Sequence, residues 1–174
     1  MRESRISLIP QTPEHSRALL EGSEAYEDCF GFRVADGVRE FLAGPEVSAE
    51  FLARLQEATI ADPWKDGFAI LHLADKIIIG LCGFTGPPGA DETVEIAYGI
   101  APLYQSRGHA SEAAQALIDY AVTSGQVRTI RAHTLPEESA STKVLRKCGF
   151  SFIGEVNHPE DGVVWQWELP AGRS

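Results

Sequence analysis

A strand-like run, a short glycine-containing turn and a helix-like run follow one another in the middle of this 174-residue chain. The run 94–100 (VEIAYGI) is apolar, and the segment 104–114 (YQSRGHASEAA) opens a helix-like pattern. The first turn of a helix leaves backbone N–H groups without partners, and the helix dipole adds partial positive charge there. Such a corner fits an anion. Gly108 and Ala110 have little or no side chain, so the backbone can approach a diphosphate closely.

These residues alone leave two interpretations open. The pattern Gln105-x-x-Gly108-x-Ala110 is not the dinucleotide pattern GxGxxG, and the chain has no GxxxxGK[ST] sequence. The unit is either a phosphate-binding corner or an ordinary strand–turn–helix connection with a glycine where packing is tight.

Two sequence blocks resemble a known family and favour the first interpretation. Segment 105–110 (QSRGHA) matches the Q/R-x-x-G-x-G/A acyl-CoA pyrophosphate signature of the GNAT superfamily of N-acetyltransferases. The block 95–113 resembles the "EIAY-I-P-Y-Q-RG-A-EA" pattern of its ribosomal-protein alanine N-acetyltransferase branch. Segments 136–141 (PEESAS) and 144–150 (VLRKCGF) resemble that branch's "PEN-AS-VL-K-GF" block. The close resemblance covers about 94–150, and the rest fits the family's layout without a sharp motif.

Length and net charge limit the number of domains and the classes of partner that we expect. The length suits one domain over 1–174 with a full core. The net charge of −10 repels nucleic-acid backbones, so we expect no nucleic-acid partner. The same charge favours the approach of cationic amines, although it also serves plain solubility.

The location follows from what the sequence lacks. No apolar run approaches the length that spans a bilayer, and 1–5 (MRESR) has no signal-peptide core, so we expect a cytoplasmic protein with no membrane partner. Three scattered cysteines, Cys29, Cys82 and Cys148, show neither metal-ligand spacing nor a disulfide framework.

Hydrophobic periodicity and turn residues predict a mixed α/β chain in the order β-α-α-β-β-β-α-β-α-β-β. The expected strands cover 5–10, 68–74, 77–84, 94–100, 127–135, 150–156 and 163–169. The expected helices cover 12–21, 45–58, 106–123 and a segment that starts at Ser139 or Ser141 and ends at 148–149. This order agrees with an α+β sandwich around a twisted sheet. The resemblance implies a GNAT-like, mostly antiparallel sheet whose strand 94–100 splays from the next strand to admit the pantetheine arm of acetyl-CoA.

Acetyl transfer to an amine needs a neutral amine, a polarised thioester carbonyl and a proton for the leaving thiolate. Alternation along 94–100 places Glu95, Ala97 and Gly99 on one face of the strand. Glu95 is therefore a candidate base, partly because related enzymes carry an acidic residue here. The alternative is a solvated or salt-bridged glutamate.

The resemblance makes Ser141 a candidate contact to the cofactor's thiol or pantetheine arm, while the same serine also suits a helix N-cap. Glu138 stands where the family has asparagine, which puts the usual pantetheine hydrogen bond in doubt. Leu145 stands where many members have a catalytic tyrosine. Tyr98 and Tyr104 are nearby in sequence, and we rank both below Ser141 as the proton donor.

The resemblance also implies the cofactor-binding set. Backbone N–H groups of the pyrophosphate loop are expected to hold the diphosphate, Ile100 to bond the pantetheine amide, and Arg107 either to contact a phosphate or to stay solvated. The expected set is Ile100, Gln105, Ser106, Arg107, Gly108, His109, Ala110, Ser111 and Ser141.

Neither the histidines nor the aromatic residues outside the two blocks are assigned a catalytic role. His72, His133 and His158 show no metal-ligand pattern, so we expect no metal. One or two aromatic residues are expected to line the acceptor pocket, from the set Tyr26, Phe30, Phe32, Trp64, Phe68 and Phe84.

The sequence thus predicts an acetyl-CoA-dependent N-acetyltransferase that acts by direct attack of an amine in a ternary complex. The acceptor is a protein N-terminus or a small amine, and a homodimer is expected by family habit. Two alternatives stay open: an antibiotic- or polyamine-modifying acetyltransferase, and a non-catalytic acyl-CoA-binding module.

Overall fold

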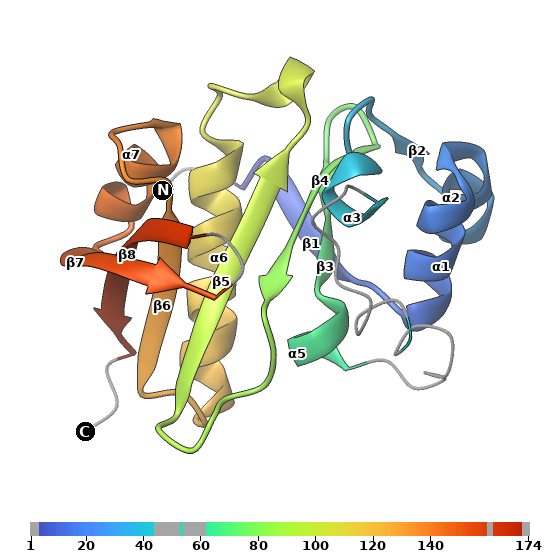
Figure 1. Ribbon diagram of the computed structural model, residues 1–174. Helices are drawn as coiled ribbons and strands as arrows, with labels where there is room; N and C mark the ends of the chain where they lie inside the picture. The colour runs from blue at the N-terminus through green and yellow to red at the C-terminus, as the bar shows by residue number, and fades with distance from the viewer. Residues whose placement is uncertain (1–3, 44–52, 54–61, 160–161, 172–174) are drawn as a thin grey trace.

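The computed structural model describes residues 4–43, 53, 62–159 and 162–171. Its eight-stranded sheet has the order β1-β3-β4-β5-β6-β8-β7, and β2 pairs with β4 (Figure 1). The strands are β1 (Ile6–Pro10), β2 (Arg33–Val34), β3 (Phe68–His72), β4 (Ile77–Phe84), β5 (Thr93–Ile100), β6 (Thr129–Thr134), β7 (Ser151–His158) and β8 (Gly162–Pro170). The helices are α1 (Pro13–Glu21), α2 (Ser23–Phe30), α3 (Glu40–Ala43), α5 (Pro63–Asp66), α6 (His109–Ser124), α7 (Ala140–Lys147) and the 3-10 helix η1 (Pro102–Tyr104).

Local sequence explains where two helices begin. Thr12 caps α1, since its side chain accepts from the His15 N–H while His15 Nδ1 accepts from the Thr12 N–H, and Pro13 occupies the first turn. Ser139 caps α7 in the same reciprocal way with Thr142. Ser141 therefore lies within the first turn of α7 and is not its cap.

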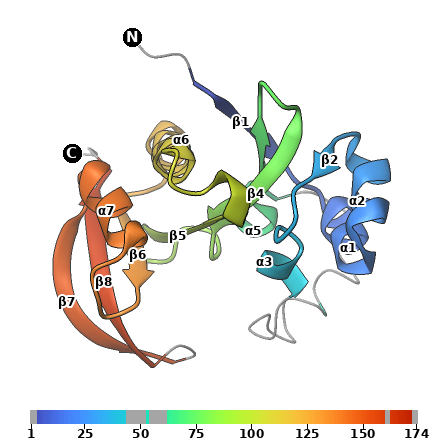
Figure 2. The ribbon, with the colours of Figure 1, turned by 90° about the horizontal axis from the view of Figure 1, so that it is seen from above.

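Two hydrophobic clusters cover the two faces of the sheet. The larger includes Val94, Ile96 and Ile100 of β5 and packs against Leu117 of α6 and Leu145 of α7. The smaller lies on the opposite face, where residues of α1 and α2 pack against β3 and β4. Figure 2 shows α6 on one side of β5 and α3 on the other. The sheet is therefore enclosed as the sequence pattern predicts, in a mixed, mostly antiparallel α/β arrangement.

The expected splay is present at the only parallel contact between two long strands of the described sheet. β5 and β6 pair over three positions, from Thr93 with Thr129 to Glu95 with Arg131. Beyond Glu95, β5 pairs with β4 alone, and β6 pairs with β8 up to Thr134. The two strands start side by side and separate toward their ends (Figure 1). Glu95 is thus the last residue of β5 that pairs with β6 before the gap between the two strands opens.

Two segments differ from what the sequence predicts, and a third predicted segment lies almost entirely outside the described residues. No helix or strand is predicted between 22 and 44, and the structure has α2 there, with the left-handed Gly31 as its C-cap. Helix α6 begins at His109 and not at Ser106, because Ser106 and Gly108 have φ angles of 64° and 87°, which a right-handed helix does not admit. The helix expected over 45–58 lies almost entirely outside the described residues. Among the described residues, no helix combines the length and apolar character needed to cross a bilayer.

Candidate functional site

The loop between β5 and α6 leaves the helix N-terminus open. Two left-handed residues, Ser106 and Gly108, turn the chain after η1. Gly108 is the N-cap of α6, and no side chain caps this end, unlike the ends of α1 and α7. The backbone N–H groups of His109, Ala110 and Ser111 therefore lack helical partners and point out of a sixteen-residue helix. This geometry suits an anion.

Gln105 turns away from the open helix end. Its Nε2 donates to the Ile100 carbonyl oxygen at 2.9 Å, which ties the loop to the last residue of β5. The Ile100 carbonyl has a second lone pair, so it can still accept from an amide. The side chain of Gln105 therefore shapes the loop, while its backbone stays in the predicted phosphate-facing segment.

Two arginines lie at this corner. The Arg107 guanidinium stacks 5.3 Å from the Tyr104 ring centre. Arg5, which the sequence reasoning missed, reaches across from the N-terminal segment: a Cβ built on Gly108 would lie 2.8 Å from Arg5 Nη2. Arg5 also makes an ion pair of 3.5 Å with Glu112. Only the tertiary fold brings this residue to the loop.

The His109 side chain lies beneath the helix end. It is buried, and neither ring nitrogen makes a hydrogen bond of ordinary geometry. Burial, reinforced by the neighbouring Arg5 charge, lowers the pKa of His109, although Glu112 works in the opposite direction. His109 therefore favours its neutral form, and its backbone N–H is the group that faces an anion.

Tyr98 and Ser141 meet on the α6 side of the gap. Burial raises the pKa of Tyr98 to about 12, and the nearby Cys148 thiol adds to this effect. The hydrogen bond with Ser141 works the other way, because a donor to the phenolic oxygen favours the phenolate. On sequence grounds Tyr98 ranks below Ser141 as the proton donor, and the structure brings the two side chains together.

The two departures from the family pattern have structural explanations. The Glu138 carboxylate binds Arg146 at 2.5 and 2.7 Å and accepts from Thr142 Oγ1 at 2.9 Å. The hydrogen bond from Arg146 is the main cause that lowers the pKa of Glu138 to about 2. Glu138 is thus held on α7 as a carboxylate. Leu145 is buried in the larger core cluster and has no polar role.

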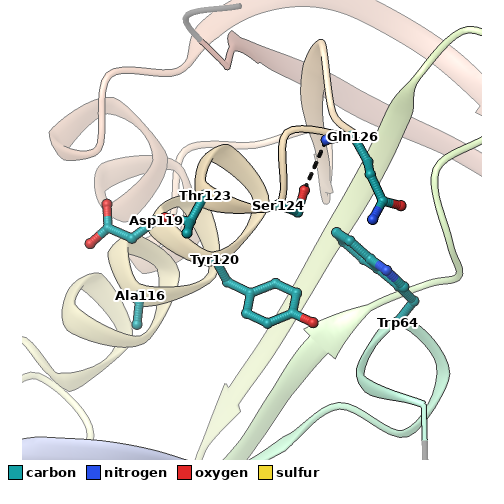
Figure 3. Close-up of a pocket in the computed structure, with 7 residues that line it drawn as sticks. All are labelled: Trp64, Ala116, Asp119, Tyr120, Thr123, Ser124 and Gln126. Atoms are coloured by element: carbon teal, nitrogen blue, oxygen red, sulfur yellow. Dashed lines mark hydrogen bonds between the residues drawn. The ribbon is translucent and has the colours of Figure 1, made fainter.

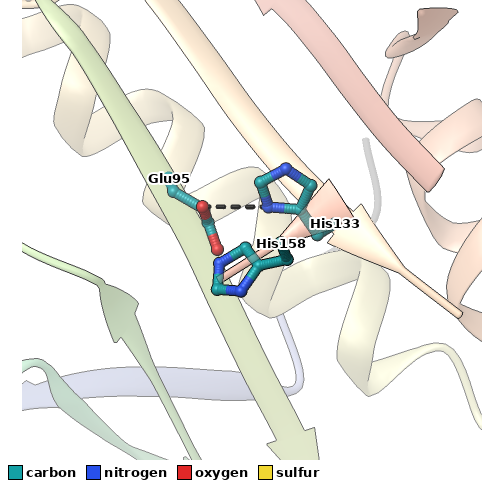
Figure 4. Close-up of side chains that lie close together, drawn as sticks. All are labelled: Glu95, His133 and His158. Atoms are coloured by element: carbon teal, nitrogen blue, oxygen red, sulfur yellow. Dashed lines mark ion pairs between the residues drawn. The ribbon is translucent and has the colours of Figure 1, made fainter. Parts of the chain in front are cut away.

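Glu95 lies on the opposite face of β5 beside two histidines (Figure 4). Its Oε1 is 3.0 Å from His133 Nδ1, and the Glu95 and His133 side chains are 25% and 13% exposed. The His133 and His158 rings lie 5.2 Å apart. The sequence shows no metal-ligand pattern among the histidines, yet the ligand atoms of His133 and His158 lie within 4.8 Å of one another and of Glu95. Glu95 and His133 come from the paired strands β5 and β6, whereas His158 comes from the end of β7, which is separated from β6 by β8.

One aromatic residue outside the expected set lies on this face. A Cβ built on Gly99 would lie 2.7 Å from the Phe41 ring, so α3 packs directly on β5, and Phe41 as a residue is 43% exposed. Tyr26, Phe68 and Phe84 of the expected set are buried in the core. Phe41 is therefore a better candidate for an acceptor-side wall than those three.

A hollow of about 540 Å³ lies elsewhere, along the later turns of α6 (Figure 3). Its lining includes Trp64, Tyr120 and Gln126. Trp64 packs there on Phe84 and Tyr120, which gives this expected pocket residue a structural role. The hollow is therefore separate from the open N-terminal end of α6.

Known proteins share this architecture. The uncharacterized N-acetyltransferase p20 of Bacillus licheniformis is 32% identical over 106 residues, which are 61% of this chain and 55% of that protein. The chain spans about half the length of the curated relatives it matches. A spermidine N-acetyltransferase from Vibrio cholerae, solved with CoA and spermine, aligns over 98% of both chains with a TM-score of 0.68 and 19% identity.

A ribosomal-protein-S5-alanine acetyltransferase from Vibrio fischeri aligns over 99% of this chain and 96% of its own, with a TM-score of 0.63 and 12% identity. At these identities the two solved structures show the shared fold and no more. The sequence itself carries the family assignment. A model of the acetyltransferase (GNAT) domain matches residues 5–151, and the chain therefore belongs to the GNAT acetyltransferase family.

Proposed function

We propose that this protein is an acetyl-CoA-dependent N-acetyltransferase in which an amine attacks the thioester directly. One observation carries the proposal: Glu95 and the Tyr98–Ser141 pair lie on opposite faces of β5, beside the gap between β5 and β6. A proton acceptor and a proton donor are thus separated by the strand at which a thioester in the gap would lie.

The open end of α6 supports cofactor binding. The unpaired N–H groups of His109, Ala110 and Ser111, together with the helix dipole, suit the diphosphate of CoA. Arg5 and Arg107 add positive charge close to the same loop. The backbone of Gln105, Ser106 and Gly108 completes the loop, and the Ile100 carbonyl lies at the entrance to the gap.

Glu95 is the proposed base. Its carboxylate is half-buried at the last paired position of β5, where an amine approaching from the α3 side would meet it. Glu95 takes a proton from the ammonium, directly or through water, and the neutral amine nitrogen then forms a bond to the thioester carbon.

The leaving sulfur departs on the other face. Tyr98 stays protonated, since its pKa is raised to about 12, and Ser141 donates to its oxygen. The Tyr98 hydroxyl is therefore free to donate a hydrogen bond to the sulfur as the C–S bond breaks. The proposed catalytic residues are Glu95, as the sequence predicted, and Tyr98, while Ser141, which the sequence predicted as the proton donor, is proposed to position the Tyr98 hydroxyl.

The acceptor is proposed to be a primary amine, either a protein N-terminus or a small molecule. The structural neighbours named above include a ribosomal-protein and a spermidine acetyltransferase, which supports both kinds of acceptor. A net charge of −10 favours a polycationic acceptor such as a polyamine, and this makes a polyamine acetyltransferase the second candidate. The paired donor and acceptor argue against a non-catalytic module. A cytoplasmic location and a homodimer stay predictions.

Calorimetric titration tests the proposal first, with acetyl-CoA and with desulfo-CoA as the thiol-free comparison. We expect saturable binding of both ligands, because the loop at the start of α6 binds the diphosphate, which both ligands contain. Turnover is then measured by thiol release with peptides that begin with alanine and with spermidine. Binding with no turnover on any amine would support the binding module, and no binding at millimolar ligand would overturn the proposal.

A further inference from the structure

Glu95, His133 and His158 come from three strands, β5, β6 and β7, and turn toward one another (Figure 4). Each offers one ligand atom, and these atoms all lie within 4.8 Å of one another. Two imidazoles and one carboxylate are a ligand set that suits zinc and neighbouring transition metals. All three side chains are half-buried, so an ion can reach them from solvent.

His133 has a ring nitrogen that the protein leaves unsatisfied. Its Nδ1 is buried and makes no hydrogen bond of ordinary geometry, although Glu95 Oε1 is only 3.0 Å away. A lone pair on Nδ1 and a carboxylate oxygen at this distance repel each other unless a positive charge lies beside them. The charge is either a second proton on the ring or a cation bound by both groups.

The other ring nitrogen is already engaged. His133 Nε2 lies 3.3 Å from Gln166 Oε1, and the Gln166 amide is oriented by donating from its Nε2 to Glu168 at 3.0 Å. Glu168 is held in turn by Arg131 at 2.9 Å. This series of contacts places the proton of the His133 ring on Nε2 and directs the Nδ1 lone pair toward Glu95. Metal-binding histidines are commonly oriented in this way through their second nitrogen.

We propose that Glu95, His133 and His158 form a binding site for a divalent transition-metal ion of the zinc class. Zinc bonds of about 2.0–2.2 Å place tetrahedral ligand atoms roughly 3.4 Å apart. The Glu95–His133 separation of 3.0 Å is already close to this value, and the remaining separations, all within 4.8 Å, close by side-chain rotation. Three protein ligands leave the fourth position open.

One consequence rests on the proposed function. An ion held by Glu95 removes this carboxylate from proton transfer, so zinc is an inhibitor of acetyl transfer at the same face. The binding site itself does not depend on this role.

Titration of chelator-treated protein with zinc chloride tests the site directly. We expect one zinc per chain, a loss of affinity of at least tenfold in His158→Asn, and a loss of about tenfold to 100-fold in Gln166→Leu, which removes the orienting amide. His15→Asn, which alters a histidine in α1, is the control and retains wild-type affinity. Thermal melting shows whether each variant is folded. If His158→Asn does not fold, His133→Asn replaces it as the variant that lacks one ligand.

The outcomes separate this inference from the proposed function. Equal zinc affinity in wild type and folded His158→Asn, or no binding at millimolar zinc, overturns the site and leaves the acetyltransferase proposal intact. Zinc binding without inhibition of turnover leaves the site in place and contradicts the role of Glu95 as the base.

Discussion

The side chain of Tyr98 on β5 lies near that of Ser141 on α7, the helix that follows β6, and the Ser141 hydroxyl lowers the pKa of Tyr98 against the larger effect of burial. The two side chains therefore approach each other beside the gap that opens where β5 and β6 stop pairing. Tyr98 is half-buried with its pKa raised to about 12, whereas Ser141 is exposed on the first turn of α7. This arrangement gives the chain a phenol near the place where the family's usual tyrosine is absent.

Replacing Tyr98 by Phe removes the hydroxyl and keeps the ring in the core. We expect kcat to fall roughly 10²-fold, the low end for a lost proton donor, while the affinity for acetyl-CoA stays within a few-fold of wild type. Tyr120→Phe makes the same change at the hollow along α6 and is the control. Steady-state kinetics on the best amine measures both.

The double variant Tyr98→Phe/Ser141→Ala shows whether the two hydroxyls act as a unit. We expect it to be little slower than Tyr98→Phe alone, because Ser141 acts through the phenol. Fully multiplicative losses would mean that Ser141 contacts the sulfur independently.

Glu95→Gln keeps the shape of the side chain and removes its capacity to accept a proton. We expect kcat to fall by about 10²- to 10⁴-fold with unchanged acetyl-CoA affinity. Glu155→Gln on the exposed side of β7 is the matched control. Wild-type turnover across the pH range in folded Glu95→Gln would show that this carboxylate is only a partner of His133.

The local features of the fold were predictable from the sequence, and the long-range ones were not. The helix start near Thr12, the alternation along β5 and the glycine turn before α6 depend on neighbouring residues, and each was predicted. The exact start of α6 was missed by three residues, because the left-handed φ of Ser106 has no signal in a serine.

The candidate site divides in the same way. Glu95 and Ser141 stand in recognisable blocks, and the loop 105–111 follows a motif. The partners of these residues depend on the tertiary fold. Arg5 of the N-terminal segment lies beside Gly108, and β6 and β7 place His133 and His158 near Glu95. No periodicity or spacing encodes such contacts, so they required the structure.

The lowered pKa of His109 predicts that acid destabilises the fold. The unfolded chain binds a proton on this residue near the ordinary value of 6.5, whereas the folded chain binds it only at lower pH. The contribution of His109 is therefore complete above pH 6.5 and decreases as the pH falls from 6.5 through the folded-state pKa. We expect the free energy of unfolding of wild type to fall in this window.

His109→Leu removes this titration at similar volume, so the difference in unfolding free energy between variant and wild type must change across the same window. Urea unfolding at several pH values between 5 and 8 measures it. His15, whose pKa burial also lowers, still titrates in the variant and accounts for a residual slope. A constant difference across the window would show that His109 is not held neutral.

Gly108 and Gly125 cap the two ends of α6 in the same left-handed conformation, with φ angles of 87° and 69°. An aspartate at either place meets similar backbone strain, of about 1–3 kcal/mol. Only at Gly108 does the new carboxylate lie beside the open N–H groups and Arg5 Nη2. Gly108→Asp and Gly125→Asp are therefore a matched pair that separates ligand binding from stability.

We expect Gly108→Asp to weaken CoA binding at least tenfold, because the carboxylate repels the diphosphate and pairs with Arg5 in its place. Gly125→Asp keeps wild-type affinity, and calorimetric titration with CoA measures both. Gly108→Ala adds bulk without charge, and its Cβ meets only the far end of the flexible Arg5 side chain, so its loss of affinity is smaller. If folded Gly108→Asp binds CoA as tightly as Gly125→Asp, the diphosphate does not lie at this end of α6, and the phosphate-binding interpretation of the loop is wrong.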